Sequence, residues 1–237
     1  MNESSLLTAE NVSKEYPAPL DGVPVKVLTR VTLTVEAKET IAVVGPSGSG
    51  KSTLLNIMSG MDEPTSGSVA FEKRNMAEMS SIERAILRNR DIGFVFQLHH
   101  LLPQCTALEN VLIPTLAFRT KPKRASEGGL RNNSQTRARE ILSRVGLDDR
   151  VNHLPSELSV GERQRVAVAR AFINKPKIVL ADEPTGSLDS ESSMRLSELL
   201  FELSRLENTA LVVVTHATDL AEMLGKQYRL MNGKLFS

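Results

Sequence analysis

The chain has 237 residues and a mass of 26.0 kDa, with 41% hydrophobic and 24% charged residues. A chain of this length and composition can bury a substantial core, which excludes a disordered or low-complexity protein. The 29 basic and 28 acidic residues leave a net charge of +1, which argues against a nucleic-acid-binding surface. The single cysteine, Cys105, excludes a disulfide within one chain and fits a reducing, cytosolic setting. The sequence has no run of 18 apolar residues and no basic leader, so we expect neither a membrane span nor a secretory signal.

The first third of the chain is predicted to consist mainly of strands. β-Branched and alternating residues favour strands over residues 6–16 and 25–35, with a proline-rich turn between them. The continuous apolar run Thr40–Val44 ends at a glycine, which is typical of a parallel strand buried on both faces. A helix over Ser52–Ser59 and a short strand over Ile92–Phe96 are expected to follow.

The middle of the chain, about residues 100–160, is predicted to be helical, with helices over Glu109–Phe118 and Thr136–Val145. Small and polar residues between these helices favour a loop there, namely Gly128, Gly129, Asn132, Asn133 and Ser134. The last third alternates again: the expected helices are Glu162–Phe172, Ser190–Glu207 and Ala217–Leu224, and the expected strands are Lys177–Ala181, Ala210–Thr215 and Gln227–Met231, the last at a sheet edge. In the helix Ser190–Glu207, one stripe is formed by Leu196, Leu199, Leu200, Leu203 and Leu206.

The alternation of strands and helices predicts an α/β fold with a mostly parallel sheet. We expect a single domain over residues 1–237. Its core would come from about residues 1–97 and 160–237, and the polar, helical segment from about 98 to 159 would form an inserted α-helical subdomain.

The strongest functional motif follows the buried strand Thr40–Val44 and opens a helix. It fits the pattern G-x-x-x-x-G-K-[ST], whose glycines let backbone N–H groups surround phosphate oxygens at a helix N-terminus. Lys51 would reach the β- and γ-phosphates, and Ser52 would offer its hydroxyl to Mg²⁺. We therefore expect nucleotide binding by Gly45, Pro46, Ser47, Gly48, Ser49, Gly50, Lys51, Ser52 and Thr53.

Two acidic residues follow the predicted strand Lys177–Ala181. Asp182 fits the carboxylate that holds Mg²⁺ in such enzymes, and Glu183 is placed to accept a proton from an attacking water. An Asp-Glu-Pro sequence by itself also fits a helix N-cap. The phosphate-binding motif elsewhere in the chain favours the catalytic interpretation.

The segment Leu158-Ser159-Val160-Gly161-Glu162-Arg163-Gln164 resembles the signature sequence of ABC ATPases. Other elements match this family in the same order: Tyr16 resembles the aromatic residue that stacks on adenine, Gln97 the Q-loop glutamine, Ser187-Leu188-Asp189 the D-loop, and His216 the switch histidine. This resemblance covers essentially the whole chain. It implies a P-loop NTPase core with a mostly parallel sheet, an N-terminal antiparallel β subdomain and an inserted α-helical subdomain.

The resemblance also implies a mechanism that one chain cannot complete. In this family two ATP-binding domains pack head to tail, and the signature of one, here Ser159, Gly161 and Glu162, closes over the nucleotide bound by the other. The implied cofactors are ATP and Mg²⁺; catalysis would involve Glu183, His216 and Gln97, and the metal would be held by Ser52, Gln97 and Asp182. The implied partners are a second copy of the chain and membrane permease subunits, with no nucleic acid. The implied location is peripheral, on the cytoplasmic face of the inner membrane.

Short stretches around Gln97–Pro103 and Asn152–Leu158 resemble the lipoprotein-releasing ATPases, within a group that includes macrolide-export and cell-division ATPases. The alternative is an ATPase of a related export or cell-division complex that drives periplasmic efflux or wall remodelling. A chromosome-maintenance ATPase is excluded, because only about a hundred residues separate the phosphate loop from the signature and leave no room for a long coiled coil. The sequence departs from the family at Val160 and Lys38, where glycine is usual, and at Ala217, where an acid is common.

Two segments are candidate contact surfaces. An apolar cluster directly after Gln97, formed by Leu98, Leu101 and Leu102, predicts a docking site for a short permease helix. The stretch Arg119–Arg139 carries seven basic residues and one acid. It is interpreted either as a solvated loop or as a contact with anionic lipid head groups.

Overall fold

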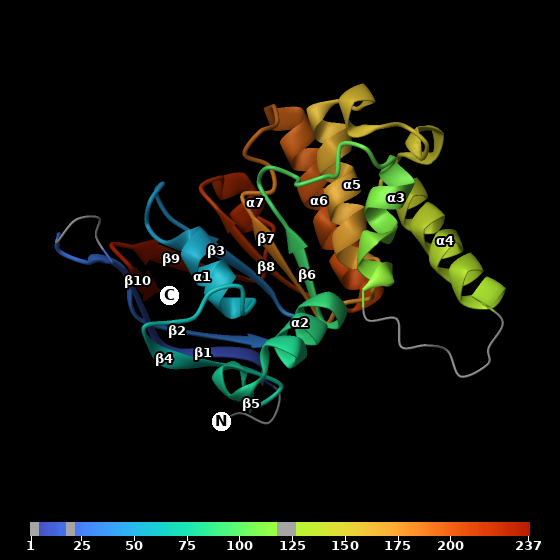
Figure 1. The fold of residues 1–237 in the computed structure, drawn as a ribbon. Helices are drawn as coiled ribbons and strands as arrows, with labels where there is room; N and C mark the ends of the chain where they lie inside the picture. The colour runs from blue at the N-terminus through green and yellow to red at the C-terminus, as the bar shows by residue number, and fades with distance from the viewer. Residues whose placement is uncertain (1–4, 18–21, 118–126) are drawn as a thin grey trace.

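The computed structural model describes residues 5–17, 22–117 and 127–237, which form two sheets and the helices packed on them (Figure 1). An antiparallel sheet has the order β2 (Val25–Glu36), β1 (Ser5–Tyr16), β4 (Ser66–Phe71) and β5 (Arg74–Asn75). A larger sheet has the order β10 (Lys234–Phe236), β9 (Lys226–Met231), β3 (Thr40–Val44), β8 (Ala210–Thr215), β7 (Ile178–Asp182) and β6 (Ile92–Val95). Among the described strands of this sheet, only β10 is antiparallel to its neighbour.

The helices lie on both faces of the larger sheet. In chain order they are α1 (Lys51–Met58), α2 (Ser81–Arg90), α3 (Ala107–Leu112), α4 (Glu127–Arg144), α5 (Val160–Phe172), α6 (Ser190–Glu207) and α7 (Thr218–Glu222), with short 3₁₀ turns at Met76–Glu78, Ile113–Leu116, Asp148–Arg150 and Pro155–Glu157. Figure 1 shows α1 between the two sheets, whereas α3 to α6 gather on the other side of the larger sheet. Among the described residues, no helix is long and apolar enough to cross a membrane.

Two hydrophobic cores form because successive strand residues point to opposite faces. In β7, Ile178 and Leu180 are buried against α1 and the antiparallel sheet. Their neighbours Val179 and Ala181 are buried against α5 and α6. A strand that is buried on both faces must be apolar throughout, which explains the continuous apolar runs of β3, β7 and β8.

The predicted α/β class with a mostly parallel sheet and an N-terminal antiparallel sheet is confirmed, and so are most of the predicted elements. Residues 98–159 contain α3, α4 and three of the 3₁₀ turns. The division of the chain into a core and an inserted subdomain at these boundaries stays a prediction.

Several expectations were wrong in detail. The predicted edge strand is β9, which lies inside the sheet because the unpredicted β10 covers it. The predicted loop at residues 128–134 belongs to α4. Ile141 and Leu142 are buried and anchor this helix, and extending an existing helix costs less free energy than nucleating a new one. The leucine stripe of α6 includes one exception, because Leu206 is 55% exposed.

The predicted helix Glu109–Phe118 is divided in the structure. The α-helix α3 starts earlier, at Ala107, because Thr106 and Glu109 form a capping box. It continues beyond Leu112 only as a 3₁₀ turn, where Pro114 cannot donate a helical hydrogen bond. Phe118 lies outside the described residues.

Candidate nucleotide site

The glycine loop of residues 45–50 connects the buried strand β3 to α1. A Cβ on Gly45 would lie 2.2 Å from the carbonyl oxygen of Leu230 in the neighbouring strand β9. Gly50 has φ 101°, and a Cβ there would lie 2.9 Å from the carbonyl oxygen of Val27 in β2. Only glycine fits these two positions, so packing against both sheets fixes the shape of the loop.

Hydrogen-bond donors in this loop suit a phosphate. Helix α1 starts after Gly50, which has no side chain to cap the first N–H groups, so these donors are available to an anion. The Ser49 hydroxyl is buried and has no hydrogen-bond partner among the described residues. Such an orphaned polar atom inside a glycine loop fits a site that receives acceptor oxygens from a ligand.

The Lys51 ammonium lies at the centre of the loop and is only 7% exposed. Its Nζ donates to the carbonyl oxygens of Gly45 and Pro46 at 2.9 and 3.1 Å, and it lies 3.3 Å from Glu183 Oε1. A buried cation held by a carboxylate and two carbonyls can exchange these neutral acceptors for phosphate oxygens, which bind ammonium groups more strongly.

Two oxygen ligands converge at the carboxyl end of β7. Ser52 Oγ, in the first turn of α1, donates to Asp182 Oδ1 at 3.0 Å. Burial raises the pKa of Asp182, and the hydrogen bond from Ser52 only partly offsets this effect. A hydroxyl and a carboxylate beside a phosphate loop fit Mg²⁺, which is usually bound by one or two protein oxygens together with phosphate oxygens and water.

Glu183 joins the loop to the end of β8. Its backbone N–H bonds to the Val214 carbonyl at 2.9 Å, and its φ is 44°, in the left-handed region. The second carboxylate oxygen, Oε2, lies 2.9 Å from His216 Nδ1 and accepts the His216 backbone N–H at 3.2 Å. With Lys51 on its other oxygen, this carboxylate has a fixed orientation and can act as a general base for a water in the site.

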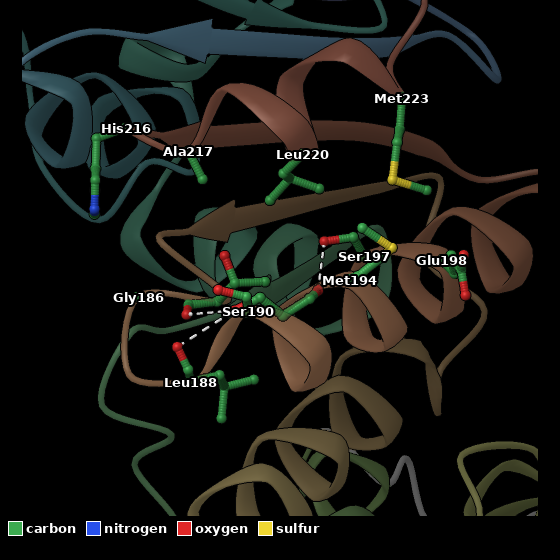
Figure 2. A pocket seen from close by; sticks show the side chains of 12 residues that line it. Gly186, Leu188, Ser190, Met194, Ser197, Glu198, His216, Ala217, Leu220 and Met223 are labelled. Carbon is green, nitrogen blue, oxygen red and sulfur yellow. Dashed lines mark hydrogen bonds between the residues drawn. The ribbon is translucent and has the colours of Figure 1, made fainter.

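His216 and Gln97 lie near the turn that follows Glu183. A Cβ on Gly186 would lie 3.5 Å from Gln97 Nε2, so Gln97 approaches this turn. A pocket of about 530 Å³ lies between this turn, α6 and α7. Figure 2 shows His216 at one end of it and Leu188 on the opposite wall. His216 is 65% exposed in its side chain, which leaves one ring edge accessible beside Glu183.

The signature residues occupy a different place. Ser159 is the N-cap of α5, and its hydroxyl accepts the Glu162 backbone N–H at 3.2 Å, while Glu162 Oε2 accepts the Ser159 N–H at 2.8 Å. Gly161 lies in the same first turn. Because α1 and α5 pack on opposite faces of the larger sheet, the chain does not bring these residues to its own glycine loop (Figure 1). The predicted helix start at Glu162 was two residues late, since the cap is Ser159.

Tyr16 lies at the end of β1, where its hydroxyl donates to Asp62 Oδ2 at 2.7 Å. Sequence reasoning missed Asp62, because nothing in the local sequence connects it with Tyr16. It also missed Arg170, whose guanidinium donates to the carbonyls of His99 and His100, just after Gln97, at 2.5 and 2.7 Å. The alternation of β1 could have indicated one further neighbour, because Lys14 shares a strand face with Tyr16.

The residues that depart from the family pattern are accommodated. Lys38 has φ 65°, in the left-handed region, which explains why glycine is favoured in this turn. Val160 is the first residue of α5 and is 38% exposed, so its side chain reaches solvent.

Comparison with known proteins assigns the family. The ABC transporter family matches residues 28–186. Two dimeric structures of MJ0796, described as a bacterial ABC transporter cassette, one of them in a post-hydrolysis state with ADP and Pi, are 37% identical over 97% of this chain and 96% of that chain, with a TM-score of 0.85. CbiO1 from Clostridium perfringens, part of the ABC transporter complex cbiONQ, is 25% identical over 99% of this chain and 88% of that chain, with a TM-score of 0.83. The chain therefore belongs to the ABC transporter family and is an ATP-hydrolysing cassette of a transporter.

Proposed function

We propose that this ATPase powers a separate membrane permease and serves in the release of lipoproteins from the inner membrane. The observation that carries the catalytic part is the convergence of Lys51, Glu183 and His216 at the ends of three neighbouring elements, beside the pair Ser52–Asp182. The family supports the transport role. The assignment of lipoproteins as the cargo depends on the sequence resemblance around residues 97–103 and 152–158.

Each residue of the site has a proposed role in hydrolysis. The glycine loop, with Thr53 beyond it, holds the phosphates, and Lys51 faces the β- and γ-phosphates. Ser52 and Asp182, with Gln97, would hold Mg²⁺, which would supply positive charge to offset the charge of the phosphates. Glu183 accepts the proton of the attacking water, and His216 holds the Glu183 carboxylate in position.

A second copy of the chain completes the site in this proposal. Ser159, Gly161 and Glu162 lie at the N-terminus of the 13-residue helix α5, away from the glycine loop of their own chain. A helix N-terminus favours anions, so this end of α5 suits the γ-phosphate bound by the other copy. The dimeric structures of MJ0796 support such an arrangement.

The permease is proposed to dock beside the Gln97 loop. A groove of about 390 Å³ is lined by Met61, Phe94, Ile113 and Arg170, among others, and Arg170 connects it to the loop by binding the carbonyls that follow Gln97. Of the three leucines predicted to contact the permease, Leu98 and Leu102 are exposed. Leu101 is partly buried and packs against the core, so it contributes less to such a surface.

The contact of residues 119–139 with anionic lipids remains part of the proposal, together with a peripheral position on the cytoplasmic face of the inner membrane. Arg119, Lys121, Lys123 and Arg124 lie outside the described residues. Arg137 is not available for lipid, because it binds Glu207 and the carbonyls of Phe172 and Ile173. The remaining basic residues would therefore have to provide the contact.

The test of this function is purification of the tagged protein from membranes, with identification of the chains that accompany it. Recovery of a permease whose deletion retains lipoproteins in the inner membrane would support the proposal. Recovery of a cell-division or efflux membrane protein instead would favour the alternative. If the wild-type protein hydrolysed ATP but no membrane protein accompanied it, the transport role would be rejected while the ATPase assignment stood.

A further inference from the structure

Three side chains form a connected group beside the ATP site: Lys14 and Tyr16 on β1, and Asp62 after α1. Lys14 Nζ donates to Asp62 Oδ1 at 2.6 Å and to the Glu63 carbonyl at 2.7 Å. The Tyr16 hydroxyl donates to the other carboxylate oxygen of Asp62 at 2.7 Å. One carboxylate thus holds both residues of the strand, and each of its oxygens has a partner.

The lysine also covers one side of the tyrosine ring. Lys14 Nζ lies 4.8 Å from the centroid of the Tyr16 ring, within the range of a cation–π contact. The Lys14 side chain is 12% exposed, whereas Tyr16 is 38% exposed. Tyr16 thus keeps accessible surface although Lys14 is nearly buried, and a flat aromatic group could stack on the ring face that Lys14 does not cover.

The group is attached to the element that carries the phosphate loop. The backbone N–H groups of Met61 and Asp62 both bond to the carbonyl of Asn56 in α1, at 2.9 and 3.1 Å. Helix α1 begins with Lys51 and Ser52. Asp62 therefore links the Tyr16 ring to the helix whose first turn would bind the phosphates, and this link fixes the distance between the two.

We propose that Lys14 and Asp62 are positioning residues for the nucleobase: together they hold the Tyr16 ring as a one-sided platform on which a purine stacks. This inference rests on the proposed role of Tyr16 at the ATP site. Stacking recognises the face of a base and tolerates any base, because every base has a π-face. The platform therefore does not distinguish one base from another, and it contributes equally to the binding of ATP and GTP.

The electrostatics of the group are consistent with this role. Burial opposes the charge of Asp62, but the hydrogen bonds from Lys14 and Tyr16 outweigh it and lower the pKa of this carboxyl. Burial and the bond to Asp62 raise the pKa of the Tyr16 hydroxyl, so this group stays a donor. Loss of either Asp62 or Lys14 would leave the ring free to rotate away from the α1 side.

The experiment compares equilibrium binding of ATP, GTP and inorganic tripolyphosphate, which has phosphates but no base. The variants Lys14→Met, Asp62→Ala and Tyr16→Phe each disturb the platform, and Tyr16→Phe keeps the ring itself. The matched control is Lys26→Met, which removes an exposed lysine of the same antiparallel sheet, paired with Glu15 at 3.6 Å. Lys51→Ala reports on the phosphate site, and Tyr16→Ala gives the largest loss that the platform can cause.

We expect the three platform variants to bind ATP and GTP more weakly by similar factors, roughly 5- to 50-fold, with tripolyphosphate binding unchanged. Lys14→Arg should retain most of the affinity, and Lys26→Met all of it. Equal losses for tripolyphosphate, or unchanged ATP affinity in Lys14→Met and Tyr16→Phe, would overturn the inference. If Tyr16→Ala bound ATP normally while Lys51→Ala did not, the base-stacking role of Tyr16 would be rejected and the proposed phosphate site would stand.

Discussion

Replacement of Glu183 by glutamine tests the centre of the proposed mechanism. The change keeps the size of the side chain and its acceptor for the His216 backbone N–H, which lies 3.2 Å from Oε2 in the structure. It removes the negative charge 3.3 Å from Lys51 Nζ and the ability to accept a proton. We expect the protein to remain folded, because Lys51 keeps its bonds to the Gly45 and Pro46 carbonyls.

The magnitude follows from the role of the residue. A positioned general base contributes at least about 100-fold to a rate, so Glu183→Gln should lower turnover by that factor or more. This loss corresponds to about 2.7 kcal/mol of activation free energy. Nucleotide affinity should be maintained, because the lost charge is negative and its removal does not weaken attraction for phosphates. An ATP-bound dimer should accumulate, since the bound nucleotide persists.

Phosphate release measures turnover, nucleotide binding measures affinity, and size-exclusion chromatography with ATP measures dimer formation. The control is Glu191→Gln, which changes a carboxylate that is 75% exposed in its side chain and pairs with Arg195 on α6. This control should hydrolyse ATP at the parent rate. Parent-rate hydrolysis by Glu183→Gln would refute the assignment of Glu183 as the base.

Three further predictions concern the phosphate loop, the segment after Gln97 and the proposed permease surface. Lys51→Ala should weaken MgATP binding by at least about tenfold, since it removes a charge-assisted hydrogen bond; equilibrium dialysis measures this, and normal affinity would contradict the phosphate-loop assignment. Arg170→Lys should lower kcat by about tenfold with little change in ATP affinity, because one of the two bonds that hold the loop after Gln97 is lost; steady-state kinetics test this, and an unchanged kcat would show that the loop holds its shape alone. Leu98→Glu with Leu102→Glu should abolish permease binding in pull-down assays and leave nucleotide binding intact, whereas an unaffected complex would remove this surface from the docking site.

The sequence was sufficient to predict the parallel strands of the larger sheet, although not β10 at its edge. Continuous apolar runs such as Thr40–Val44 have one simple explanation, a strand buried on both faces, and the structure confirms it. Because parallel strands end at the same edge, residues that directly follow β3, β7 and β8 had to meet there. Glu183 and His216 were therefore predictable as neighbours, and their atoms lie 2.9 Å apart.

Contacts between segments far apart in the sequence were not predictable in this way. The pairing of Tyr16 with Asp62 depends on how β1 crosses the end of α1, and no local pattern encodes this crossing. The same holds for β9, whose sequence indicates a strand but not which neighbours it pairs with. The start of α4 contains glycines and was therefore predicted as a loop. The free-energy cost of glycine in a helix is smaller here than the gain from extending a helix that is anchored further along the chain.

Helix α5 connects the signature residue Ser159 to the segment after Gln97, so a movement at one of these places can be transmitted to the other. Its N-terminus carries Ser159, which is proposed to contact the nucleotide of the second copy. Further along the helix, Arg170 binds two backbone carbonyls of the segment after Gln97, and it also lines the groove proposed for the permease. A helix is stiff along its axis, so closure of the second copy on Ser159 and movement of the permease in the groove would both displace the Gln97 segment. Hydrolysis and permease movement would then be coupled through one helix, without any flexible connection between them.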